Sequence, residues 1–150
     1  MKLTVSKLNN FLLFKLPSAF FCGVRVKEID VNKCVVSVKH RWINQNPFNS
    51  MYFAVQAMAA ELSTGALVMF QIAKSGRKIS MLVANNKGTF TKKATGRVTF
   101  TCNGGHLIEK AILETIATGE GQTFWMKSIG TNETGIQVSE MDFEWSVRIK

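Results

Sequence analysis

The sequence is poor in proline, cysteine, histidine and acidic residues, and each shortage excludes a class of protein. Only 2 of the 150 residues are proline and 19% are charged, while 46% are hydrophobic, so the chain is neither collagen-like nor intrinsically disordered. The three cysteines, Cys22, Cys34 and Cys102, stand far apart and form no CxxC pair. This spacing disfavours a disulfide framework or a structural zinc site, and we interpret the cysteines as buried thiols in a reducing cytoplasm.

The common catalytic signatures are also missing. His40 and His106 lie far apart without an HExxH or similar companion, so the sequence predicts no metal site. No GxSxG nucleophile motif occurs and no Ser-His-Asp set is indicated, which argues against a covalent hydrolase. The length suits one domain with a modest core, and we expect a single domain over residues 1–150.

Acidic residues number 10 against 19 basic ones, which gives a net charge of +9. Such a balance favours anionic partners, which include nucleic acid, phosphate esters and acidic lipid headgroups. The three tryptophans, Trp42, Trp125 and Trp145, do not alternate with the basic clusters as an RNA-stacking platform would. A nucleic-acid partner therefore rests on the net charge alone, and we expect none.

Residues 1–21 are predicted to form an N-terminal capping helix and a lead-in to the domain. The apolar run over residues 8–22 resembles the core of a secretory signal, but Lys15 and Pro17 interrupt it and no clean A-x-A site follows. We expect instead an amphipathic helix over residues 6–16, with Ser6 as its N-cap. Its apolar face carries leucines at four-residue spacing, namely Leu8, Leu12 and Leu16.

The longest apolar segment covers residues 51–73, which are rich in alanine, methionine and leucine and contain no proline. Its length and composition would suit a transmembrane helix. Polar residues nevertheless crowd its middle, and one of them is Glu61, a carboxylate whose insertion at mid-bilayer would cost about 3 kcal/mol. Because strands are predicted on both sides, we interpret the segment as a helix buried in a soluble protein, with no membrane span.

Strand patterns surround this helix. Alternating or β-branched runs predict strands over residues 24–29, 34–42, 97–102, 122–129 and 136–149, and a short helix over 106–117. The runs 78–85 and 87–93 together predict one long strand. We expect a kink near Gly88, and a turn at residues 94–96 that pairs the flanking strands as a hairpin. This order of elements indicates an α+β architecture, in which an antiparallel sheet wraps around one long central helix.

Glu61 is the only carboxylate between Asp30 and Glu109, an interval that holds ten basic residues. An unpaired buried carboxylate is costly, so we expect Glu61 to be hydrogen-bonded, protonated with a raised pKa, or exposed to a cleft. Each of these states makes a useful acid or base. The alternative is a structural glutamate, which caps a loop or pairs with a basic residue across a subunit interface.

Small residues share the helical face of Glu61. Ala54, Ala57 and Gly65 fall on the same stripe at helical spacing, and small side chains there would let another backbone or a ligand approach. Gln56 borders this stripe.

A polar loop, residues 46–50, precedes the helix. If Asn49 or Ser50 is the N-cap, the free amides of the first turn point toward this loop and could stabilise an anion or polarise a carbonyl oxygen. Asn49 would add a side-chain amide donor. The alternative is ordinary capping and turn formation by asparagine and serine.

Basic residues cluster after the helix and around the predicted turn. The two clusters are Lys74, Arg77 and Lys78, and Lys92, Lys93 and Arg97. They are either solvated loop charges or a phosphate clamp at the mouth of a cleft that the helix lines.

The segment Asn46 to Gly65 reads NPFNSMYFAVQAMAAELSTG and resembles the central helix of the hotdog-fold thioesterases and dehydratases. It is most similar to a poorly characterised thioesterase-like branch, in which an asparagine-bearing loop precedes the helix and Ala-Glu-Leu followed by Gly occurs within it. Residues 92–96, KKATG, resemble the lysine-bearing turn of the same branch. The resemblance covers most of the chain, from about Gly23 to Ile149.

The resemblance implies a homodimer or tetramer whose sheets join edge to edge, with an acyl-thioester site at the dimer interface. Asn49, Ser50 and the Met51 amide would polarise the thioester carbonyl, and Glu61 would activate water. The other implied substrate-binding residues are Asn46, Gln56, Ala57, Gly65, Lys92 and Lys93. Coenzyme A would enter only as part of the substrate, and no cofactor is implied.

The working hypothesis is therefore the hydrolysis of small-molecule acyl thioesters of coenzyme A, or of thioesters on an acyl carrier protein. The alternative is a non-catalytic hotdog protein that binds acyl groups or other lipids in the same tunnel.

Overall fold

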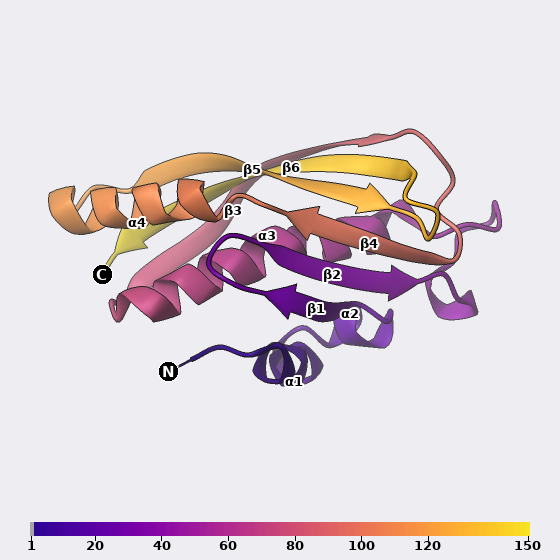
Figure 1. Ribbon diagram of the computed structural model, residues 1–150, viewed down its shortest axis with the longest axis horizontal. Coiled ribbons are helices and arrows are strands. Elements are labelled where there is room, and N and C mark those ends of the chain that lie inside the picture. Colours follow the sequence, from indigo (N-terminus) through magenta and orange to yellow (C-terminus); the bar gives the residue numbers. More distant parts are fainter. Residues whose placement is uncertain (1) are drawn as a thin grey trace.

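The computed structural model describes residues 2–150 and shows a curved antiparallel sheet with one long helix beneath it (Figure 1). The sheet has six strands in the order β1-β2-β4-β5-β6-β3. The strands are β1 (Arg25–Ile29), β2 (Cys34–Lys39), β3 (Ile79–Phe90), β4 (Arg97–Cys102), β5 (Gln122–Thr131) and β6 (Gln137–Ile149). The helices are α1 (Val5–Lys15), α2 (Pro17–Phe21), α3 (Phe53–Ser75) and α4 (Gly105–Thr118), with a 3-10 turn η1 at Trp42–Asn44. The predicted α+β architecture is confirmed.

Helix α3 is the centre of the core. Its inner face packs against β2, β4 and β5, and its Ser63 Oγ lies 2.7 Å from Ser128 Oγ, while Trp145 Nε1 donates to Thr64 Oγ1 over 2.9 Å. The helix ends at Gly76, whose φ of +66° is the left-handed conformation that glycine adopts without strain. Within residues 2–150 it is the one helix long and apolar enough to cross a membrane, but most of it is buried in the protein. It is a core helix, as predicted.

The sheet differs from the sequence prediction in its pairing. Strand β4 pairs with β2 and β5 rather than with β3, so the expected hairpin around residues 94–96 is wrong. The long strand predicted before it is β3, but its irregularity lies between Val83 and Asn85 and not at Gly88. Strand β2 ends at Lys39, and Trp42 lies in η1 with its side chain exposed. These pairings depend on contacts between distant segments, which local patterns do not encode.

The N-terminal segment packs at the β1 edge of the sheet. Helix α1 begins after Thr4, whose Oγ1 accepts a hydrogen bond from the Lys7 N–H, so the N-cap is Thr4 and not Ser6. Asn9 pairs with β1 as a neighbouring strand would, because it donates to the Val26 oxygen over 3.0 Å and accepts from the Val26 N–H over 2.9 Å. This pairing satisfies part of an otherwise open sheet edge. Of the predicted apolar face, Leu8 and Leu12 are buried and Leu16 is exposed.

Two of the cysteines face each other in the core. Cys34 on β2 is directly opposite Cys102 on β4, and both are fully buried. Burial raises the pKa of the Cys34 thiol to about 12 and that of the Cys102 thiol to about 11, so both stay protonated and unreactive. Cys22 is half-buried.

The start of α4 is pressed against the turn between β1 and β2. A Cβ atom at Gly105 would lie 2.0 Å from the Val31 carbonyl oxygen and 2.7 Å from the Asn32 Cα. The Gly105 N–H also donates to the Asn32 oxygen over 3.1 Å. Only glycine allows this approach of two backbones.

We therefore predict that Gly105→Ala lowers the free energy of unfolding by about 1–3 kcal/mol or more, because two backbone segments must move apart. Gly121→Ala is the matched control, since its nearest neighbour would lie 3.8 Å away, and it should change stability by less than about 0.5 kcal/mol. Urea denaturation of the two variants measures the difference. Equal stability of the two variants would contradict the packing described.

Candidate functional site

Helix α3 begins later than the sequence predicts. Its N-cap is Tyr52, which has an extended backbone and makes no side-chain capping hydrogen bond. The expected N-caps, Asn49 and Ser50, are therefore wrong. The Tyr52 N–H donates to the Asn44 carbonyl oxygen over 2.9 Å, so a contact with η1 rather than a local cap positions the first turn.

The Asn46 side chain organises the loop before α3. Its Oδ1 accepts from the N–H groups of Phe48 (2.9 Å) and Ser50 (3.2 Å), and its Nδ2 donates to Ser50 Oγ (3.0 Å) and to the Met51 oxygen (3.3 Å). Asn49 lies at the tip with a φ of +58°, a left-handed conformation that asparagine tolerates better than most residues. Ser50 is buried, so its hydroxyl holds the loop together.

Most backbone amides in this region already have acceptors. The Met51 N–H donates to the Ala94 oxygen over 2.8 Å, and the Ser50 N–H donates to Asn46 Oδ1 within the loop. Neither N–H is therefore free to polarise a substrate carbonyl, contrary to the expectation from the sequence. Among residues 2–150, the N–H groups of Phe53 and Ala54 have no acceptor, as is usual in the first turn of a helix. These two amides lie at the positive end of the α3 dipole and are the donors available to an oxyanion or phosphate.

A cavity of about 400 Å³ opens between this loop and the segment that leads to β4. We call it the loop cavity, and it is lined by Asn46, Phe48, Ser50, Met51, Gln56, Phe90, Thr91, Lys92, Lys93 and Ala94. Lys93 Nζ donates to the Phe48 oxygen over 3.1 Å and ties the two sides together, whereas Lys92 is exposed. Most of the substrate-binding residues predicted from the sequence therefore meet here.

Gln56 lies in the wall of the loop cavity, on the first turns of α3. Its side chain is 4% exposed, and its Oε1 has no hydrogen-bond partner within the described residues 2–150. A buried amide oxygen without a donor is costly, because it has lost water and gained nothing in exchange.

Glu61 lies farther along α3 and lines a second cavity. This cavity, about 260 Å³, is bounded by the elbow between α1 and α2, and we call it the elbow cavity. Its lining is largely apolar and consists of Lys15, Leu16, Pro17, Ser18, Ala19, Met58, Glu61 and Leu62. The Glu61 carboxylate is half-buried and, in the chain from residue 2 onward, has no hydrogen bond or ion pair. Burial raises its pKa above the ordinary value of 4.5.

The free amides and Glu61 face the same side of α3. Ala54 and Glu61 are seven residues apart, which is close to two full turns and about 10 Å along the helix axis. Helical side chains lean toward the N-terminus, so the carboxylate extends toward the free amides. Ala57 lies between them, half-buried and small. Gln56 points about 140° away around the helix, so Glu61 and the loop cavity occupy different sides of α3.

Gly65 does not leave room for a ligand. A Cβ atom there would lie 3.0 Å from the Trp145 ring and 3.3 Å from Glu61 Oε1. The predicted opening at Gly65 is therefore filled by Trp145, and the glycine serves the packing of α3 on β6.

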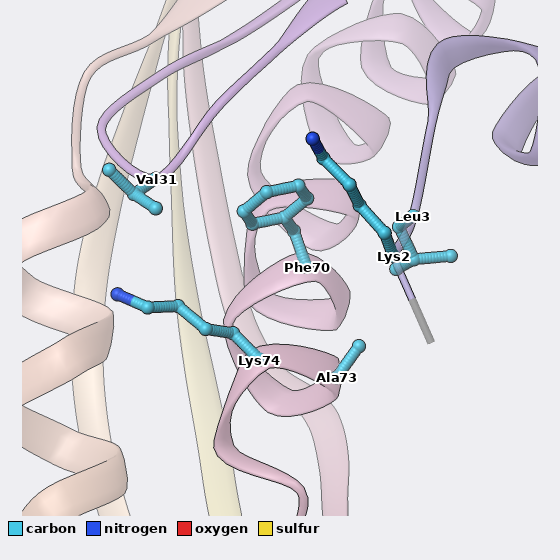
Figure 2. A pocket seen from close by; sticks show the side chains of 6 residues that line it. All are labelled: Lys2, Leu3, Val31, Phe70, Ala73 and Lys74. Carbon is cyan, nitrogen blue, oxygen red and sulfur yellow. The ribbon is translucent and has the colours of Figure 1, made fainter.

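A third cavity, about 340 Å³, lies at the opposite end of α3. Figure 2 shows Phe70 between the side chains of Lys2 and Lys74, whose ammonium groups point in different directions. The first basic cluster therefore contributes Lys74 to a cavity that is separate from the loop cavity and also holds Lys2. Over the part of the chain that the structure describes, no three histidine, cysteine or acidic side chains are grouped as metal ligands.

One feature that sequence analysis missed is a group of exposed aromatic side chains at the start of α3. This aromatic rim consists of Phe48, Tyr52, Phe53 and Phe90. The Phe53 ring contacts Tyr52 at 5.1 Å and Phe90 at 6.1 Å between centroids, both edge to face. The adjacent Tyr52 and Phe53 are visible in the sequence, but they read as the beginning of an apolar helix. Exposed apolar groups of this size mark interaction surfaces.

Known proteins match the chain over nearly its whole length. The profile of a family described as a domain of unknown function, DUF4442, matches residues 6–147. No curated protein matches. Among solved structures, a Pseudomonas aeruginosa protein of unknown function that carries the name "Probable Thioesterase" has a TM-score of 0.82 at 21% identity, over 100% of this chain and 99% of that chain.

Two further solved structures are similar to this chain over nearly its whole length. A protein of unknown function from Chlorobaculum tepidum has a TM-score of 0.86 at 12% identity, over 97% of this chain and 94% of that chain. A thioesterase from Haemophilus influenzae has a TM-score of 0.76 at 12% identity, over 99% and 93%. These likenesses confirm the hotdog fold. The chain belongs to the DUF4442 family, whose model matches it over residues 6–147.

Proposed function

We propose that the protein hydrolyses acyl thioesters, with Glu61 as the general base. The observation that carries this proposal is a half-buried carboxylate without a partner among residues 2–150, beside an apolar cavity and in line with free helix amides. Such a group is costly for stability, and its raised pKa makes it a stronger base than an ordinary glutamate. The thioesterase names of the proteins from Pseudomonas aeruginosa and Haemophilus influenzae support the proposal.

The chemistry follows from the positions of these groups. The Phe53 and Ala54 amides hydrogen-bond to the carbonyl oxygen and stabilise the charge that develops on it, and the exposed Asn49 side chain is proposed as a further donor. Glu61 takes a proton from a water molecule, whose oxygen forms a bond to the carbonyl carbon. The bond from carbon to sulfur then breaks, and the proton passes to the leaving thiolate. The products are a carboxylic acid and a free thiol.

The two cavities divide the substrate between them. The acyl group occupies the elbow cavity, whose lining beside Glu61 is apolar. The arm that carries the thioester occupies the loop cavity, and its phosphate meets Lys92. Coenzyme A is then part of the substrate and not a cofactor. A cytoplasmic location agrees with such substrates and remains a prediction.

A second copy of the chain would complete the site. Strand β3 is a long unpaired edge of the sheet in the described chain, and the aromatic rim lies at its end. Joining two sheets through β3 would pair this edge, cover the rim and bring the partner chain beside the loop cavity. We expect a homodimer, or a tetramer built from such dimers.

Glu61→Gln should lower kcat for acyl-CoA hydrolysis by about 10²–10⁴-fold, because the amide cannot accept the proton from water. Glu114→Gln, an exposed substitution on α4, is the matched control and should retain the wild-type rate. A panel of acyl-CoA substrates measures both. Equal rates for wild type and Glu61→Gln would remove Glu61 from the mechanism. Absence of turnover together with thermal stabilisation by acyl ligands would indicate a non-catalytic acyl-binding protein instead.

The raised pKa of Glu61 also predicts how stability depends on pH. Because the native protein holds this proton more tightly than the unfolded chain does, native stability falls as the pH rises from about 4.5 through the native pKa. Glu61→Gln removes this dependence, so its stability advantage over wild type should grow as the pH rises above about 4.5 and level off above the native pKa of Glu61. Urea denaturation at a series of pH values measures the difference. A constant difference would show that the carboxylate is not desolvated.

The assembly can be tested by light scattering. Wild type should have at least twice the chain mass of 16.7 kDa. Phe90→Arg places a charge in the aromatic rim and should shift the protein toward the monomer, because an unpaired charge resists burial. Phe14→Arg, at an exposed position on α1, is the control and should leave the mass unchanged. A monomeric wild type would contradict the shared site.

A further inference from the structure

Helix α3 carries two buried glutamines that differ in one respect. Gln71 is 5% exposed, and its Nε2 donates to the Val31 carbonyl oxygen over 2.7 Å. Gln56 is 4% exposed, and its Oε1 has no donor anywhere in residues 2–150. The first glutamine fastens α3 to the turn between β1 and β2. The second makes no such attachment, so packing of the native chain does not account for it.

An apolar side chain would serve the fold better at position 56. A buried amide that lacks a partner destabilises the native state, whereas an apolar group of similar shape would not. Gln56 lines the loop cavity with its Oε1 buried, so a rotation about χ3 would present that oxygen to a ligand in the cavity. Polar groups that are unsatisfied in the free protein and lie in a cavity wall are typical of ligand recognition.

The other polar groups of the loop cavity are largely engaged. Asn46 and Ser50 hydrogen-bond to each other, and Lys93 Nζ is bound to the Phe48 oxygen. Lys92 is exposed, and no ion pair or hydrogen bond is found for its ammonium group in the described chain. The cavity therefore offers a ligand two uncommitted groups, one amide and one cation, from opposite walls.

We propose that Gln56 is a specificity-determining residue that reads a secondary amide of a phosphopantetheine arm while Lys92 binds the phosphate of the same arm. A secondary amide presents both an N–H and a carbonyl oxygen. It can therefore pair with the Gln56 amide in either of the two orientations that rotation about χ3 allows. The inference rests on the proposed function for its substrate class, and it concerns binding rather than the chemical step.

The shared chemistry of the ligand is the arm, which coenzyme A and a holo acyl carrier protein both present. Isothermal titration with coenzyme A and with a holo acyl carrier protein separates these two sources, since each is titrated on its own. Pantetheine, which has the amides and lacks the phosphate, isolates the contribution of Gln56 from that of Lys92.

Gln56→Met should weaken coenzyme A binding at least tenfold and should raise the urea midpoint of unfolding, because it replaces an unsatisfied amide with an apolar group of similar length. Gln71→Met is the matched control, and it should lower the urea midpoint and leave the dissociation constant within about twofold. Lys92→Gln should weaken the binding of coenzyme A and leave that of pantetheine unchanged. If Gln56→Met fails to fold, Gln56→Asn is the second variant. It shortens the side chain by one methylene, so the amide no longer reaches the ligand and binding should weaken in the same way.

Wild-type affinity for coenzyme A from Gln56→Met would overturn the inference, as would the absence of binding by wild type up to about 1 mM, the weak end of the affinity scale. The outcome is separable from that of the proposed function. Loss of binding in Gln56→Met without hydrolysis of any acyl-CoA would retain the arm site and reject the enzyme. Hydrolysis by wild type with an unchanged KM in Gln56→Met would retain the enzyme and reject the arm site.

Discussion

The packing of α3 against the sheet is the constraint on which the rest of the structure depends. The helix is buried along most of its length, and three of its polar side chains reach fixed partners: Ser63 at Ser128, Thr64 at Trp145, and Gln71 at Val31. These contacts set both the rotation and the axial position of the helix. They therefore also fix the positions of Gln56 and Glu61, which lie in the walls of two cavities on different sides of the same helix.

The positions of the Glu61 carboxylate and the Gln56 amide therefore follow from the fold, and both groups lower the stability of the native state. Burial of Glu61 penalises its charged form, and burial of the Gln56 amide removes water without supplying a donor. Natural proteins accept such costs at functional sites, where local rules are broken and stability is supplied elsewhere. In this protein, the compensating stability comes from the close-packed core beneath the sheet, which includes Phe100, Leu67 and Met126. The rim of exposed aromatic side chains adds an interaction surface beside the same site.

Sequence patterns predicted the central helix, the six strands and, among the options for Glu61, a raised pKa or a position in a cleft, because periodicity and composition are local properties. The N-cap was wrong because Tyr52 is positioned by the Asn44 carbonyl, in a different segment. The hairpin was wrong because β4 pairs with β2 and β5 rather than with β3, its neighbour in sequence. The elbow cavity could not be foreseen, since it needs the docking of α2 on α3. Gly65 was misread for the same reason, because its partner Trp145 is eighty residues away.

The central claim is that Glu61 and the free amides of α3 act on one thioester. A crystal structure with an unreactive thioether analogue of an acyl-CoA tests it most directly. The account predicts that the analogue's reacting carbon lies between the Phe53 and Ala54 amides and a water held by Glu61, with its apolar end in the elbow cavity. An analogue bound elsewhere, or one that leaves Glu61 facing only protein, would contradict the account and leave the fold as its sole surviving part.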